Sequence, residues 1–60
     1  MPDVRMRARA LVRERGATAA ARELRVPRET LLGVAADAHV HEATLELVAA
    51  RLAEHEAGRP

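Results

Sequence analysis

The sequence predicts an all-α fold, a compact bundle of four helices in a single domain. Its large apolar residues are only Leu, Val and Met, because Phe, Trp, Tyr and Ile are absent, and much of the 48% hydrophobic content is Ala. Ala and Leu favour helices, and the aromatic and β-branched excess typical of strands is missing. Apolar residues recur at helical spacing in four segments. A chain of 60 residues is close to the lower size limit for an independent core, so we also expect a homodimer.

The first helix is expected from about Asp3 to Arg15. Asp3 is suited to the N-cap, and Gly16 to a left-handed C-terminal stop. The apolar residues of this segment follow helical spacing and mark its buried stripe: Val4, Ala8, Leu11 and Val12.

Two short helices are expected next, joined by a tight turn. Thr18 is the predicted N-cap of the second helix, which should end near Leu24. Pro27 suits the first turn of the third helix, which should end near Ala36 or Asp37, followed by a short loop over 37–40. The residues that we expect these two helices to bury are Ala20, Ala21, Leu24, Leu31, Val34 and Ala35.

The fourth helix is expected from about His41 to Glu56, with Gly58 as a stop and residues 58–60 as a frayed tail. Glu42 and Glu46 lie at its positive end. It carries two apolar stripes, one of Leu45, Val48 and Leu52 and one of Ala43, Leu47 and Ala50. The second stripe indicates either contact with the first helix or a subunit interface. Residues of the first segment offer an alternative subunit interface: Met1, Val4 and Met6.

Residues 16–34 have the pattern of a DNA-binding helix-turn-helix. Ala21 is small where the two helices must cross, Leu24 and Val26 flank the turn, and Leu31 and Val34 supply the inward face of the second helix of the unit. This pattern predicts a small DNA-binding domain.

The chain resembles the repressor-type helix-turn-helix domains of the XRE, or Cro-like, family over about residues 4–55. The similar segments are Ala-Ala-Arg-Glu-Leu-Arg-Val-Pro-Arg-Glu-Thr-Leu at 20–31 and Ala-Thr-Leu-Glu-Leu-Val-Ala-Ala-Arg-Leu at 43–52. The short Gly-Ala-Thr lead-in at 16–18 is nearer to the Fis-like version of the motif. The resemblance implies a transcriptional regulator whose recognition helix lies in the major groove of double-stranded DNA, bound as a two-fold dimer to a palindromic site.

By this resemblance, the helix after Pro27 presents a face to the bases that consists of Arg28, Glu29, Leu32, Gly33 and Ala36. The residues placed for phosphates are Thr18, Arg22, Arg25 and Thr30. The family usually carries Gly at the position of Arg25, so we expect Arg25 to adopt a left-handed backbone at a cost of roughly 1 kcal/mol.

Few residues of this face can read a base. Arg28 is suited to a bidentate contact with guanine and Glu29 to accepting from cytosine, while Leu32 or Ala36 can touch a thymine methyl group. Gly33 permits close approach to the groove but weakens the helix. The same scarcity of hydrogen-bonding groups favours an alternative function: a trihelical interaction or oligomerisation module, antitoxin-like or part of an assembly, with Leu32, Gly33 and Ala36 as an apolar docking face.

Charge is segregated along the chain. The net charge is +1, all ten basic residues are Arg, seven of them lie at 5–25, and five of the nine acids lie at or after Asp37. One surface is therefore expected to meet phosphate and another to face water or a partner, although solvated helix faces give the same pattern. Arg5, Arg9 and Arg13 recur every four residues and repel one another by a few tenths of a kcal/mol per pair, which an acidic partner or a phosphate backbone would relieve.

Several other classes of function are disfavoured. Without Cys or Ser, the chain has no thiolate metal site and neither of the two commonest nucleophiles, so we expect no enzyme, cofactor or small-molecule substrate. We do not expect His39, His41 and His55 to bind a metal, since no thiolate accompanies them, and we interpret His41 as a surface side chain. There is no apolar run for a membrane span, and the basic first segment lacks Trp and Phe for membrane insertion, so we expect a soluble cytoplasmic protein without membrane partners.

Overall fold

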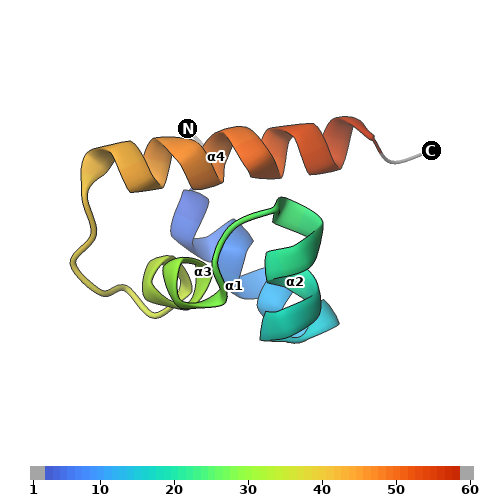
Figure 1. Cartoon of the computed structure of the whole chain (residues 1–60), viewed down its shortest axis with the longest axis horizontal. Coiled ribbons are helices and arrows are strands. Elements are labelled where there is room, and N and C mark those ends of the chain that lie inside the picture. Colours follow the sequence, from blue (N-terminus) through green and yellow to red (C-terminus); the bar gives the residue numbers. More distant parts are fainter. Residues whose placement is uncertain (1–2, 59–60) are drawn as a thin grey trace.

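The computed structural model describes residues 3–58, and helices make up most of this part of the chain (Figure 1). They are α1 (Val4–Arg15), α2 (Ala17–Leu24), α3 (Arg28–Ala35) and α4 (Glu42–Ala57). Each of the four contacts the other three, and α4 lies across the group formed by α1, α2 and α3. The predicted all-α arrangement of four helices is therefore confirmed. Between residues 3 and 58, no helix is long and apolar enough to cross a bilayer.

The core contains only Ala, Leu and Val. Every helix contributes, and the turn after α2 adds one residue: Ala8, Leu11, Ala20, Ala21, Leu24, Val26, Leu31, Val34, Ala35, Val48 and Leu52. The expected stripes are confirmed at these positions, with Val4, Val12 and Leu45 partly buried against them. Full burial of one Leu or Val side chain contributes about 1.5–3 kcal/mol relative to exposure. A core of these small residues leaves the fold dependent on polar contacts between the helices as well.

Gly16 separates α1 from α2 and belongs to the ends of both helices. Its N–H donates to the carbonyl of Val12 at 2.7 Å, and its own carbonyl accepts from the N–H of Ala20 at 3.0 Å. The positive φ expected of Gly16 is present at 85°, but ψ is 153°, so the residue is not left-handed helical and lies in a backbone region that is essentially restricted to Gly. The prediction that Thr18 caps α2 was wrong. The helix begins at Ala17, so Thr18 is already its second residue, and the N-cap is Gly16.

The other predicted N-cap is confirmed. Asp3 precedes α1 with an extended backbone, and its Oδ1 accepts from the backbone N–H of Arg5 at 2.9 Å. Such a cap satisfies one of the N–H groups that the first turn of a helix leaves without a partner.

The turn between α2 and α3 is built on a left-handed residue, as the sequence predicts. Arg25 has φ 57° and ψ 44°. Its N–H donates to Arg22 at 3.2 Å and the N–H of Val26 donates to Ala21 at 3.1 Å, which is the bond pair of a Schellman motif. Pro27 precedes α3 instead of lying in its first turn, because its ψ of 141° is extended.

A second Schellman motif ends α3 one residue earlier than predicted. The N–H of Ala38 donates to Gly33 at 3.0 Å and that of Asp37 to Val34 at 3.4 Å. This arrangement requires a positive φ at Asp37, which is 65°. The loop to α4 therefore begins at Ala36 and is longer than expected, covering 36–41.

The predicted fourth helix is confirmed, shifted by one residue at each end. His41 is the N-cap, and Gly58 ends the helix with a right-handed φ of −81°. Residues 59–60 of the expected tail lie outside the described residues. Leu47 is 42% exposed, and Ala43 and Ala50 are also exposed, so the second stripe of α4 does not pack on α1.

The alternative subunit interface predicted from the sequence lies in the first segment of the chain. Met6 is 64% exposed, whereas Val4 is partly buried against the core. Met1 lies outside the described residues. Exposed apolar side chains therefore occur on both α1 and α4.

We predict that Arg25→Gly stabilises the protein. Gly removes the left-handed strain of about 1 kcal/mol but increases the entropy of the unfolded chain, so the net gain should be roughly 0.5 kcal/mol. The matched control is Arg22→Gly, three residues earlier and inside α2, which should lose about 1 kcal/mol. Urea unfolding followed by far-UV circular dichroism measures both changes. A loss of stability in Arg25→Gly would show that its side chain makes a contact that outweighs the strain.

Candidate nucleic-acid interface

The first turn of α3 carries the two side chains with the strongest capacity to read bases. Arg28 and Glu29 are exposed and adjacent at the start of this helix. They are directed outward because the buried face of α3 is occupied by Leu31, Val34 and Ala35. A guanidinium group and a carboxylate side by side provide both hydrogen-bond donors and acceptors at one end of a short helix.

The rest of the predicted reading face is less open. Thr30, Leu32 and Gly33 are half-buried, and Ala36 is exposed just beyond the end of the helix. A Cβ atom at Gly33 would lie 3.6 Å from Cγ1 of Val40, so the loop over 36–41 covers part of this position. The freely accessible part of the face therefore consists of Arg28, Glu29 and Ala36.

Most of the arginines at 5–25 contact their own chain. Four of these seven side chains make ion pairs or hydrogen bonds to other elements: Arg5 to α3 and its following loop, Arg7 to Glu56, Arg9 to Ala35 and Arg15 to Glu23. The basic half of the sequence is therefore largely engaged in holding the helices together. Only part of it remains for an external phosphate group.

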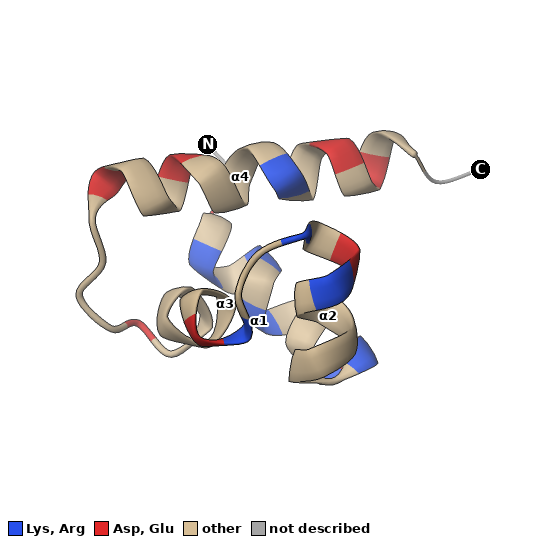
Figure 2. Ribbon diagram, viewed as in Figure 1, with Lys and Arg blue, Asp and Glu red and all other residues tan. Residues whose placement is uncertain are grey.

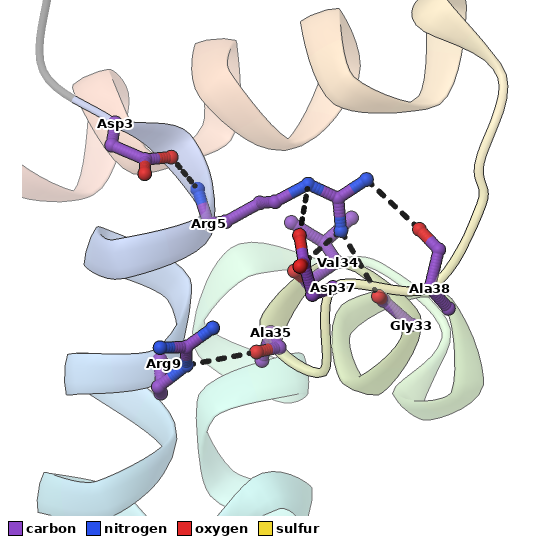
Figure 3. A network of polar contacts seen from close by, with 8 residues as sticks. All are labelled: Asp3, Arg5, Arg9, Gly33, Val34, Ala35, Asp37 and Ala38. Carbon is purple, nitrogen blue, oxygen red and sulfur yellow. Dashed lines mark hydrogen bonds and ion pairs between the residues drawn. The ribbon is translucent and has the colours of Figure 1, made fainter.

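Arg5 and Arg9 of α1 both bind the C-terminal end of α3 (Figure 3). One Nη of Arg5 donates to the carbonyl of Val34 at 3.1 Å, and the other donates to Ala38 at 2.8 Å. Nε of Arg9 donates to the carbonyl of Ala35 at 3.0 Å. An acidic partner or a phosphate was expected to relieve their mutual repulsion. Arg5 does contact an acid, Asp37, at 3.3 Å, and both arginines also meet the negative end of a helix dipole. The spacing of four residues placed these arginines on one face of α1 but did not indicate which groups they bind.

The remaining exposed arginines are distributed over α1, α2, the turn and α3. In residues 3–58, the side chains of Arg13, Arg22, Arg25 and Arg28 have no hydrogen bond or ion pair. Thr18 and Arg22 lie one turn apart on α2, and both are exposed. Their spacing places them on one side of that helix.

Arg25 has different surroundings from the other predicted phosphate ligands. It lines a shallow surface depression together with Arg51, Glu54 and His55 of α4. Glu23 also lines this depression, so it contains two arginines and two carboxylates, and Arg25 has a mixed electrostatic environment for a phosphate.

Acidic residues are concentrated on α4. It carries Glu42, Glu46, Glu54 and Glu56 and a single basic residue, Arg51, whereas α1 and α2 carry most of the arginines (Figure 2). The separation of basic from acidic residues along the sequence is therefore a separation between helices in the structure. A polyanion is repelled from the outer side of α4 and is better tolerated where α2 and α3 meet.

The histidines do not converge. Nε2 of His55 lies 2.8 Å from Oε1 of Glu23 and joins α4 to α2, while His39 and His41 are exposed in the loop before α4. Across residues 3–58, no three His, Cys, Asp or Glu side chains are grouped so as to hold a metal ion.

Comparison with known proteins gives no relative. No protein-family model matches the chain, and neither a curated protein nor a solved structure is significantly similar to it. The resemblance to repressor-like domains therefore stays a hypothesis, and the functional interpretation depends on the geometry described above.

We predict that Gly33→Ala stabilises the protein by about 0.5–1 kcal/mol. Ala has the higher helix propensity, and the added Cβ meets only ordinary van der Waals contact with Val40. Gly16→Ala is the contrasting variant. No atom lies within 4 Å of the added Cβ, but a φ of +85° is strained for Ala, so the free energy of unfolding should fall by about 1–2 kcal/mol. In thermal unfolding, the melting temperature should rise in Gly33→Ala and fall in Gly16→Ala. Destabilisation by Gly33→Ala would mean that the loop over 36–41 cannot yield to the methyl group.

Proposed function

We propose that α2 and α3 form a helix-turn-helix and that the protein binds the major groove of double-stranded DNA as a repressor-like transcriptional regulator. The observation that carries this proposal is the shape of the α2–α3 unit. Two helices of eight residues each are joined by a left-handed turn, with Ala21, Leu24 and Val26 buried around it. The first turn of the second helix leaves Arg28 and Glu29 exposed. A recognition helix contacts base edges mainly through such N-terminal residues.

Each exposed side chain has a proposed role. Arg28 donates to O6 and N7 of a guanine, Glu29 accepts from N4 of a cytosine, and Ala36 contacts a thymine methyl group. On α2, Thr18 and Arg22 contact the phosphate backbone and set the register of the protein on the duplex.

The remaining predicted contacts have weaker support. Arg25 is exposed but lies beside Glu54, and Thr30, Leu32 and Gly33 are half-buried. We propose that these residues add to the contact surface after the first turn of α3 has entered the groove. Specific recognition therefore depends chiefly on Arg28 and Glu29.

A homodimer is part of this proposal. Palindromic sites match the two-fold symmetry of a dimer, and the exposed stripe of Ala43, Leu47 and Ala50 on α4 provides an apolar surface for a second copy. The acids of α4 make this face unsuitable for DNA. We also propose that the protein acts in the cytoplasm.

One observation favours the alternative function, a module that binds protein. Four arginines of the basic half are engaged within the chain, and the exposed part of α3 has few groups that read bases. In that case Leu32, Gly33 and Ala36 form a docking face for a partner protein.

The two functions are separated by selection from a random duplex library over a salt series. A DNA-binding regulator enriches a palindrome and loses affinity steeply as salt rises, since each neutralised phosphate contributes about −0.9 to the slope of log K against log salt. Salt-sensitive binding without enrichment would indicate a nucleoid-type accessory factor instead of a sequence-specific regulator. Absence of binding even at low salt would reject DNA binding and leave the protein-binding module.

On the selected sequence, Arg28→Ala should lose about 1–3 kcal/mol of binding free energy and relax specificity at one base pair. Arg13→Ala is the matched control, because it also removes an exposed guanidinium group, but from α1, outside the α2–α3 unit. An equal loss by Arg28→Ala on every sequence would assign Arg28 to a phosphate contact.

Leu47→Glu should produce monomers if α4 forms the dimer interface, because it places a charge within the apolar stripe that also contains Ala43 and Ala50. Sedimentation velocity measures the oligomeric state of this variant. Met6→Glu tests the other exposed apolar residue and should leave the dimer intact. A dimeric Leu47→Glu together with a monomeric Met6→Glu would show that the interface lies on α1 instead.

A further inference from the structure

The end of α3 is held by a side chain from a distant part of the sequence. The guanidinium group of Arg5 contacts three carbonyl groups: Val34 at 3.1 Å, Ala38 at 2.8 Å and, more weakly, Gly33 at 3.5 Å. Its Nε also lies 3.3 Å from Oδ1 of Asp37 (Figure 3). Arg5 therefore joins the last turn of α3 and the start of the following loop to α1.

With Arg9, this contact completes the pairing of the last four carbonyl groups of α3. The carbonyl of Leu32 accepts from Ala36, and those of Gly33 and Val34 accept from the Schellman motif and from Arg5. The carbonyl of Ala35 accepts from Arg9. Backbone N–H groups that follow the helix already pair Leu32, Gly33 and Val34, so α1 supplies the partner of Ala35 and a second donor to Gly33 and Val34.

The start of α3 is held by apolar packing of Val26 and Leu31, which are buried, and not by a side-chain hydrogen bond. Its N-cap is Pro27, which makes no side-chain cap hydrogen bond. An eight-residue helix is only about 12 Å long. A rotation about Pro27 would therefore displace the C-terminal turn, with Leu32 and Ala36, relative to Arg28, and the orientation of the helix depends on what holds its far end.

We propose that Arg5 is a positioning residue for nucleic-acid recognition: by fixing the C-terminal end of α3, it sets the angle at which this helix meets the groove. The inference rests on the proposed function. Arg5 itself makes no contact with DNA in this mechanism, because its guanidinium group is already bound to α3 and Asp37. Its loss should affect discrimination between sequences more than non-specific attraction to phosphates.

Arg7 provides a matched control for Arg5. It lies on the same helix, its side chain is 24% exposed compared with 22% for Arg5, and it also makes a charged contact. Its partner, however, is Glu56 of α4, at 2.6 Å. Arg5→Met and Arg7→Met therefore remove the same charge from α1, but only the first releases α3.

The experiment compares the affinities of both variants for the selected palindrome and for a scrambled duplex, at a temperature where circular dichroism shows each variant folded. Arg5→Met should reduce the ratio of the two affinities by about fivefold to a hundredfold, the range for losing recognition of one base pair. The slope of log K against log salt should not change. Arg7→Met should keep both the ratio and the slope.

Three results would overturn the positioning role. These are an unchanged ratio in folded Arg5→Met, an equal loss in Arg7→Met, or a decrease of about 0.9 in the salt slope, which would assign Arg5 to a phosphate. If Arg5→Met does not fold, Arg5→Lys serves instead, since Lys keeps the charge without the planar fork and should also reduce the ratio. Failure of the wild-type protein to bind any duplex rejects the proposed function itself, before any variant is compared.

Discussion

The pairing of the C-terminal carbonyl groups of α3 by Arg5 and Arg9 is the constraint on which the arrangement of the helices depends. The core consists of Ala, Leu and Val and contributes little area per residue, so apolar packing alone specifies the helix positions weakly. A guanidinium group has directional donors in a fixed plane and binds only at particular angles. The ion pair with exposed Asp37 adds little stability in water, and the bonds to backbone carbonyls carry the specificity.

Features determined within a few residues of the chain could be predicted from the sequence. The four helices follow from apolar periodicity, and Asp3 acts as an N-cap because its side chain needs only a neighbouring N–H group. The left-handed backbone of Arg25 was expected from the resemblance, because the repressor-type domains usually carry Gly at this position. Each of these outcomes is set by local geometry, and the tertiary structure reinforces it.

Features that depend on distant contacts were not predictable in the same way. The arginines of α1 were expected to meet an acidic partner or phosphate. Acids do pair with Arg5, Arg7 and Arg15, but the residue types do not indicate these particular pairings or the contacts with the carbonyls at the end of α3. Val40 covers part of Gly33 because the loop folds back on α3, which the residue types do not indicate. For the candidate site, sequence and structure agree that Arg28 and Glu29 are exposed at the start of α3, while their contact with DNA stays a prediction.

The double role of Gly16 affects how the chain can be altered. Because this one residue ends α1 and begins α2, the two helices have no spacer between them, and an added residue would rotate one against the other by about 100°. Fraying of either helix also removes the end of its neighbour, so the pair should melt as one cooperative unit. The loop over 36–41 contains no such shared residue. Evolution or design can lengthen this protein between α3 and α4, whereas the junction of α1 and α2 has a fixed length.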